Sequence, residues 1–230
     1  MNSVSQAELV SPIVRRFTAV QLLIAIALLV VTTPFVEPLR SGPLIESILF
    51  TVVLVSGILA IAHRPHQVII AAVLAVAALA GRWIHHFRPD VMPPELFLIG
   101  GMLFVLFVII HLLRFVLTAD GVDTEVLCAS ISAYLLLGLL WTLAYWLVAE
   151  LIPGAFAFNV AAAGDTSLQG FNGMYYSFIT MSTVGYGDIT PVAKVARMLA
   201  ATEAMTGLLY VAVLIARLVA LQATPKSHES

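Results

Sequence analysis

Six apolar stretches, each of about the length that crosses a lipid bilayer, constrain this fold more than any other feature of the sequence. A spanning helix needs about 20 mainly apolar residues, because each residue adds about 1.5 Å and the hydrocarbon core is about 30 Å thick. The stretches lie at about 17–35, 44–62, 68–83, 95–118, 124–151 and 191–221, and the third is short and rich in alanine. Only 10% of the residues are charged, against about 25% in a typical soluble domain. We therefore predict an all-α membrane protein with six transmembrane helices.

Charge and motif content exclude several classes of protein. The formal net charge is −2 and no basic stripe is present, so we predict no nucleic-acid partner. The single cysteine, Cys128, has no partner for an internal disulfide. Arg15 and Arg16 precede the first stretch, but no small-residue cleavage site follows it, so we interpret this stretch as a retained anchor. The HExxH, GxSxG and P-loop patterns are absent, and we predict neither an enzyme nor a cofactor.

The interval between the fifth and sixth stretches is longer than the other breaks. It opens with a polar turret at 161–167 and continues with 171–182, which is too short to span but long enough for about three helical turns. Backbone that is not helical is tolerated at membrane depth only where protein buries it or where it lines a water-filled path. We therefore predict a re-entrant helix followed by an extended loop.

That loop carries the sequence Thr183-Val184-Gly185-Tyr186-Gly187. Successive carbonyl groups of an ordinary strand point to opposite sides. They can all point to one side only if alternate residues adopt backbone dihedral angles that are unfavourable for any residue with a Cβ atom. Glycine removes this penalty at positions 185 and 187. The threonine hydroxyl adds one further oxygen at the inner end. A row of oxygens of this kind can replace the water around a dehydrated cation.

The loop resembles the selectivity filter of the tetrameric potassium channels, and the likeness extends over about 124–221. The resemblance implies a homotetrameric pore with K⁺ as the transported ion. It implies that K⁺ is held by the carbonyls of Thr183, Val184, Gly185, Tyr186 and Gly187 and by the Thr183 hydroxyl. It also places Asp188 at the outer mouth of the filter. Gly207 falls where the family often has a hinge glycine, although close helix packing explains a glycine there equally well.

The sequence departs from the family at one supporting position. Some members carry a pore-helix glutamate that partners the outer-mouth aspartate, and Ile179 stands there in this chain. We expect Asp188 to find another donor: Tyr175, Tyr176 or water. We hypothesise that aromatic packing supports the filter more than a carboxyl pair does. Glu203, in the sixth helix, either supports the filter from behind, responds to pH, or makes a structural hydrogen bond to the pore-helix backbone.

Local signals add detail to the pore region. We expect Asp123 or Thr124 to cap the fifth helix, and Pro191 to occupy the first turn of the sixth. An aromatic cluster toward the outer half of the fifth helix predicts either an interfacial belt or a cuff around the filter; its members are Trp141, Tyr145 and Trp146.

The four helices before the pore have the layout of a voltage-gated channel without its charges. A sensor needs several arginines at three-residue spacing, and the fourth stretch has only Arg114, near its inner end. We expect this arginine to reach the headgroups rather than to sense voltage. The predicted divisions are a cytoplasmic segment at 1–16, a four-helix domain at 17–118, a pore domain at 119–222 and a cytoplasmic tail at 223–230. The four-helix domain could brace the pore, set assembly, or respond to lipid or tension.

The leading interpretation is a potassium-selective channel that passes K⁺ passively. The alternatives are a silent or modulatory subunit of another channel, a less selective cation channel, a secondary transporter and a membrane enzyme. Lysine and arginine are split almost evenly between the two sides, so only the filter resemblance sets the orientation. It implies a multi-pass protein with both termini in the cytoplasm. The compact loops and the absence of a recognisable regulatory domain lead us to expect the bacterial inner (plasma) membrane. The expected partners are three further copies of the chain and membrane lipid, with no soluble partner.

Overall fold

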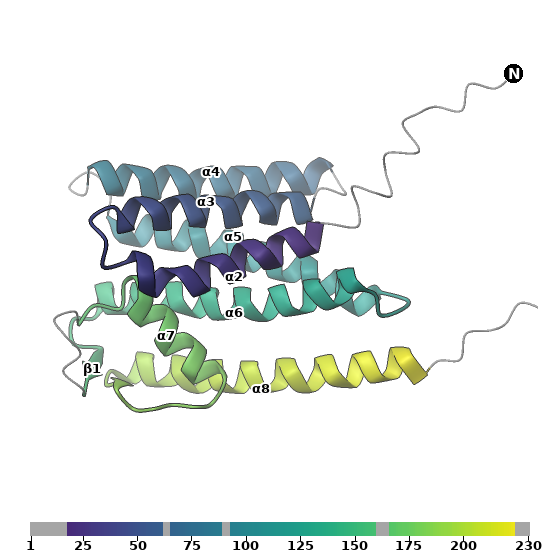
Figure 1. Ribbon diagram of the computed structural model, residues 1–230. Coiled ribbons are helices and arrows are strands. Elements are labelled where there is room, and N and C mark those ends of the chain that lie inside the picture. The colour runs from purple at the N-terminus through teal and green to yellow at the C-terminus, as the bar shows by residue number, and fades with distance from the viewer. Residues whose placement is uncertain (1–17, 62–64, 89–92, 160–165, 224–230) are drawn as a thin grey trace, which may run out of the picture.

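The computed structural model describes residues 18–61, 65–88, 93–159 and 166–223. Within these ranges six helices are long and apolar enough to cross a membrane, which confirms the predicted fold class (Figure 1). They are α2 (Thr18–Val36), α3 (Gly42–Ala60), α4 (Pro65–Phe87), α5 (Pro94–Thr118), α6 (Thr124–Leu151) and α8 (Lys194–Ala223). The alanine-rich third stretch forms a helix of 23 residues, longer than the sequence indicated.

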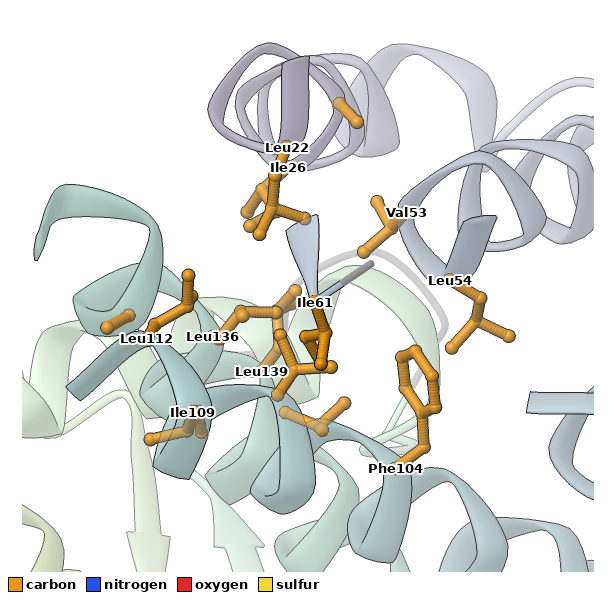
Figure 2. Close-up of a cluster of buried hydrophobic side chains, with 14 of the residues drawn as sticks. Leu22, Ile26, Val53, Leu54, Ile61, Phe104, Ile109, Leu112, Leu136 and Leu139 are labelled. Atoms are coloured by element: carbon orange, nitrogen blue, oxygen red, sulfur yellow. The ribbon is translucent and has the colours of Figure 1, made fainter. Parts of the chain in front are cut away.

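Helices α2 to α6 form one bundle, in which α2 contacts both α3 and α6 while α5 contacts α4 and α6. Figure 2 shows its core, where Leu22, Ile26 and Leu54 face Phe104 and Leu136. Each of these side chains is at most 1% exposed. Lipid tails are as apolar as leucine, so these contacts stabilise the bundle through close packing rather than through escape from water. Of the four helices before α6, α2 and α5 therefore pack directly against it, while α3 packs on α2 and α4 on α5.

The segment between α6 and α8 holds the re-entrant helix that the sequence predicted. Helix α7 (Gly170–Met181) lies obliquely between α6 and α8 in Figure 1 and contacts both. Two short strands, β1 (Phe156–Phe158) and β2 (Ile189–Pro191), pair antiparallel on either side of α7 in the sequence. This small sheet has no signal in the sequence, and it ties the end of the loop after α7 to the chain leaving α6. Most of the predicted turret, at 161–167, lies outside the described residues.

Pro191 does not begin the last helix, so that prediction was wrong. It is the final residue of β2 and pairs with Phe156, and α8 begins three residues later at Lys194. The next two amides, of Val192 and Ala193, donate to the Ala155 carbonyl at 2.8 and 3.2 Å. The pairing with β1 therefore holds the chain extended past the proline before the helix can start.

The end of the bundle at which α2 and α6 begin is fixed by two acidic side chains. Asp123 Oδ1 accepts a hydrogen bond from the Val126 amide at 2.8 Å, which confirms the predicted cap of α6. Glu125 Oε2 accepts from the Ala19 amide at 3.1 Å, which joins the start of α6 to the start of α2. The predicted divisions at 1–16 and 223–230 fall almost wholly outside the described residues.

Candidate functional site

The loop after α7 has an unusual backbone. Three alternate residues have positive φ: Thr183 at 59°, Gly185 at 51° and Gly187 at 79°. Positive φ reverses the strand geometry at every second residue, as a backbone requires in order to turn successive carbonyls toward one side. The two glycines match the sequence prediction. The sequence did not predict positive φ at Thr183, since a β-branched residue is strained in this region.

The last turn of α7 holds the inner end of this loop. The Ile179 carbonyl accepts hydrogen bonds from the amides of Val184 and Gly185, at 2.8 and 3.2 Å. The Thr183 amide donates to the Thr180 carbonyl at 2.9 Å. Ile179 therefore supports the loop through its backbone, which any residue type could provide.

The outer end of the loop is held by hydrogen bonds from two directions. The Tyr175 hydroxyl donates to Asp188 Oδ2 at 2.7 Å, so Asp188 has one of the donors that the sequence led us to expect. Burial and the Asp188 carboxylate raise the pKa of Tyr175 to about 12. Asn159, just after β1, donates from Nδ2 to the Gly187 carbonyl at 2.8 Å. Sequence reasoning missed Asn159, because only the β1–β2 pairing brings it across 28 residues to the filter loop.

Glu203 lies behind the loop, where its residue is 0% exposed. Its two carboxyl oxygens contact two hydroxyls: Oε2 accepts from Tyr145 on α6, and Oε1 accepts from Ser177 on α7 at 2.6 Å. The expected bond to the pore helix is therefore present, but it reaches a side chain rather than the backbone. Through this one side chain α8 is joined to both α6 and α7.

Aromatic rings pack beside this carboxyl group. Tyr176 contacts Tyr145 edge-on, with ring centroids 4.8 Å apart, and Phe156 at 5.6 Å. Tyr176 is thus directed into this cluster, while the neighbouring Tyr175 reaches Asp188. Edge-to-face pairs of this kind contribute about 0.5–1.5 kcal/mol each beyond their buried area. Tyr145 belongs to an aromatic cuff beside α7, while Trp146 bonds Glu150 at 2.9 Å near the end of α6.

Gly207 lies where α8 passes the end of α7. A Cβ at this position would overlap the carbonyl oxygen and the side chain of Met181. Close helix packing therefore requires a glycine here, whatever part the residue has in hinge motion.

The comparisons with known proteins agree with this arrangement. A family model described as an ion channel matches residues 145–222, from the end of α6 through α7 to α8. Protein LctB of Geobacillus stearothermophilus is 31% identical over 123 residues, which cover 43% of this chain and 91% of that protein.

The chain belongs to the ion channel family.

A further relative of this channel is two pore potassium channel b of Oryza sativa subsp. japonica. It is 32% identical over 74 residues, which cover 31% of this chain. The matched part is 21% of the rice protein, so the chain spans about a fifth of that relative's length. No solved structure matches the channel. Together with the six apolar helices, the family identifies a multi-pass membrane channel and points away from an enzyme.

Proposed function

We propose that this channel is potassium-selective and passes K⁺ passively through a filter formed by Thr183 to Gly187. The observation that carries the proposal is the alternation of positive φ at 183, 185 and 187. In this proposal the backbone carbonyls and the Thr183 hydroxyl replace the hydration shell of K⁺. Asp188 stands at the outer mouth, and the filter is supported by Tyr175, Tyr176, Ile179 and Glu203. The resemblance of a rice potassium channel to this chain supports the choice of ion.

We propose further that four copies of the chain surround one pore. A single loop offers oxygens from one side only, so a complete shell requires several copies around an axis. Val184 and Tyr186 are 51% and 73% exposed in the single chain, as expected of side chains that neighbouring subunits would cover. The long apolar face of α8 is exposed as well, at Met205, Leu208, Leu209, Val213 and Ile215 among others.

The proposed orientation places both termini in the cytoplasm of a bacterial cell, because the filter loop of the resembled channels enters from outside. Arg114, the only arginine of α5, is exposed near the end of the helix opposite Glu95. A single exposed arginine gives a voltage sensor little gating charge. We therefore expect a channel whose opening depends weakly on voltage.

Current through purified channel in a planar bilayer, with K⁺ on one side and Na⁺ on the other, tests the proposal. We expect reversal near the K⁺ equilibrium potential and a conductance that changes little with voltage. Reversal near zero would instead indicate a less selective cation channel. If the chain alone gave no current but conducted when a second channel subunit was added, the result would favour the interpretation that the chain is a modulatory subunit.

Two matched glycine variants link the result to the filter. Gly185→Ala and Gly154→Ala each place a Cβ at positive φ, at 51° and 76°, with no atom within 4 Å in the single chain. The strain is therefore similar, roughly 1–2 kcal/mol. We expect Gly185→Ala to abolish selective current and Gly154→Ala, in the turn after α6, to retain it. Equal loss in both variants would contradict the assignment of the filter.

A further inference from the structure

A cavity of about 540 Å³ lies between the bundle of α2 to α6 and the pore helix α7. This volume is within the range of about 300–1,000 Å³ that is typical of ligand sites. Its polar end is lined by Glu37, Glu46 and Arg82, and its partly exposed apolar part includes Phe50 and Leu143. None of these five residues belongs to the proposed filter or to its support.

The cavity extends from one end of the bundle through most of a membrane leaflet. Its charged lining lies at the ends of helices: Glu37 directly follows α2, and Arg82 is near the end of α4. Its partly exposed apolar lining reaches eight residues from the same end of the bundle, at Phe50 from Gly42 and at Leu143 from Leu151. At 1.5 Å per residue this is about 12 Å, most of one half of the 30 Å hydrocarbon core. A headgroup at the end of the bundle and the first part of an acyl chain fit this shape.

The charges at the polar end favour a headgroup that carries an ammonium. Arg82 is paired with Glu46 at 3.9 Å and donates from Nε to Ser47 Oγ at 3.1 Å. Glu37 is a second carboxylate, so two negative groups face one positive group. The remaining negative charge attracts an ammonium, and the guanidinium beside it suits a phosphate.

We propose that this cavity binds one acyl chain of a phospholipid whose headgroup carries a primary ammonium. The ammonium meets Glu37, the phosphate meets Arg82, and the chain lies along Phe50 and Leu143. A primary ammonium donates hydrogen bonds to a carboxylate, whereas a choline headgroup has no N–H to donate. A glycerol headgroup has no positive charge at all.

This site is joined to the pore helix by one hydrogen bond. Glu37 Oε2 accepts from the Phe171 amide, in the first turn of α7, at 2.8 Å. A Cβ on Gly170 would lie 3.1 Å from Glu37 Oε1, so the carboxylate sits directly against the start of α7. A lipid that binds Glu37 is therefore positioned to bias α7; this consequence alone rests on the proposed function.

Retained lipid, measured by mass spectrometry on the purified full-length chain, tests the site without any current. The protein is equilibrated with equal amounts of phosphatidylethanolamine, phosphatidylcholine and phosphatidylglycerol that have identical acyl chains, and loosely held lipid is then washed away. We expect phosphatidylethanolamine to be enriched over the other two. Retention that is equal for all three, equal for ethanolamine and choline, or highest for glycerol would overturn the proposal.

Glu37→Gln keeps an oxygen for the Phe171 amide and removes only the charge. We expect it to lower retained phosphatidylethanolamine about fivefold, the worth of one partly exposed ion pair. Glu150→Gln removes one carboxylate at the same end of the bundle; Glu150 does not line the cavity, and the variant keeps an oxygen for its two donors that do, Trp146 and Gln169, so retention should be unchanged. Equal retention by Glu37→Gln and wild type would overturn the role of Glu37. Soluble phosphoethanolamine should not compete, and effective competition would overturn the role of the acyl chain.

Discussion

The bond between Tyr145 and Glu203 offers the sharpest test of how the pore is held together. Tyr145→Phe removes one hydroxyl and leaves Glu203 Oε2 without its donor. Both residues are 0% exposed, so water does not reach the carboxyl group to replace the lost bond. The aromatic packing of Tyr145 on Phe156 and Tyr176 is retained, because the ring is unchanged.

The expected cost follows from the surroundings of the carboxyl group. Side-chain hydrogen bonds in membrane proteins average about 0.6 kcal/mol and reach about 1.7. An unsatisfied buried polar atom costs about 1–3 kcal/mol. Since Glu203 is fully buried and bonded through both oxygens, we expect a value at the top of the membrane range. We predict a loss of about 1.5 kcal/mol in the free energy of unfolding.

The assay is denaturation of the channel in mixed micelles with increasing sodium dodecyl sulfate. Tyr134→Phe is the matched control, since it removes a hydroxyl from the same helix, and that hydroxyl makes no hydrogen bond within the described part of the chain. Ser177→Ala and the double variant with Tyr145→Phe complete a cycle, which isolates the coupling of the two donors through Glu203. If Tyr145→Phe and Tyr134→Phe agreed within about 0.3 kcal/mol, Glu203 would not depend on this bond.

Two further predictions concern the filter and its surroundings. Tyr175→Phe should speed the loss of current during sustained conduction, because Asp188 loses its hydroxyl donor. Since the pKa of Tyr175 is raised to about 12 from its usual value near 10, this hydroxyl stays protonated at neutral pH. The hydrogen bond to Asp188 is therefore complete below about pH 10 and is lost as the pH approaches 12. The rate at which wild-type current is lost should accordingly be the same at pH 7 and pH 8, and a faster loss at pH 8 would need a cause other than Tyr175. Gly207→Ala should gain about 1 kcal/mol of helix propensity but lose about 1–3 kcal/mol to overlap with Met181. Denaturation in the same micelles measures the net loss, and a stabilised variant with slower opening would instead favour a hinge.

How much of the site the sequence could reveal depends on how local each interaction is. The glycines of the filter loop were predictable, because their backbone requirement belongs to the residues themselves. The Asp123 cap was predictable for the same reason, since donor and acceptor lie three residues apart. The prediction that Pro191 lies in the first turn of a helix was wrong, because Pro191 pairs with Phe156, 35 residues earlier, and this pairing holds the segment extended.

Taken alone, the sequence determined that the chain lies in lipid and that its six long apolar stretches are helices. Six apolar stretches can be satisfied only in lipid and only as helices, since a bilayer offers no partner for free backbone groups. The tertiary structure decided which distant side chains meet: Asn159 with Gly187, Glu203 with Tyr145 and Ser177, and Glu37 with the start of α7. The sequence indicated the pore helix as one possible partner of Glu203, but not which group on it, and it gave no sign of the other contacts. Only the packing of α2, α6, α7 and α8 brings these groups within reach, because a hydrogen bond depends on tenths of an ångström and not on composition.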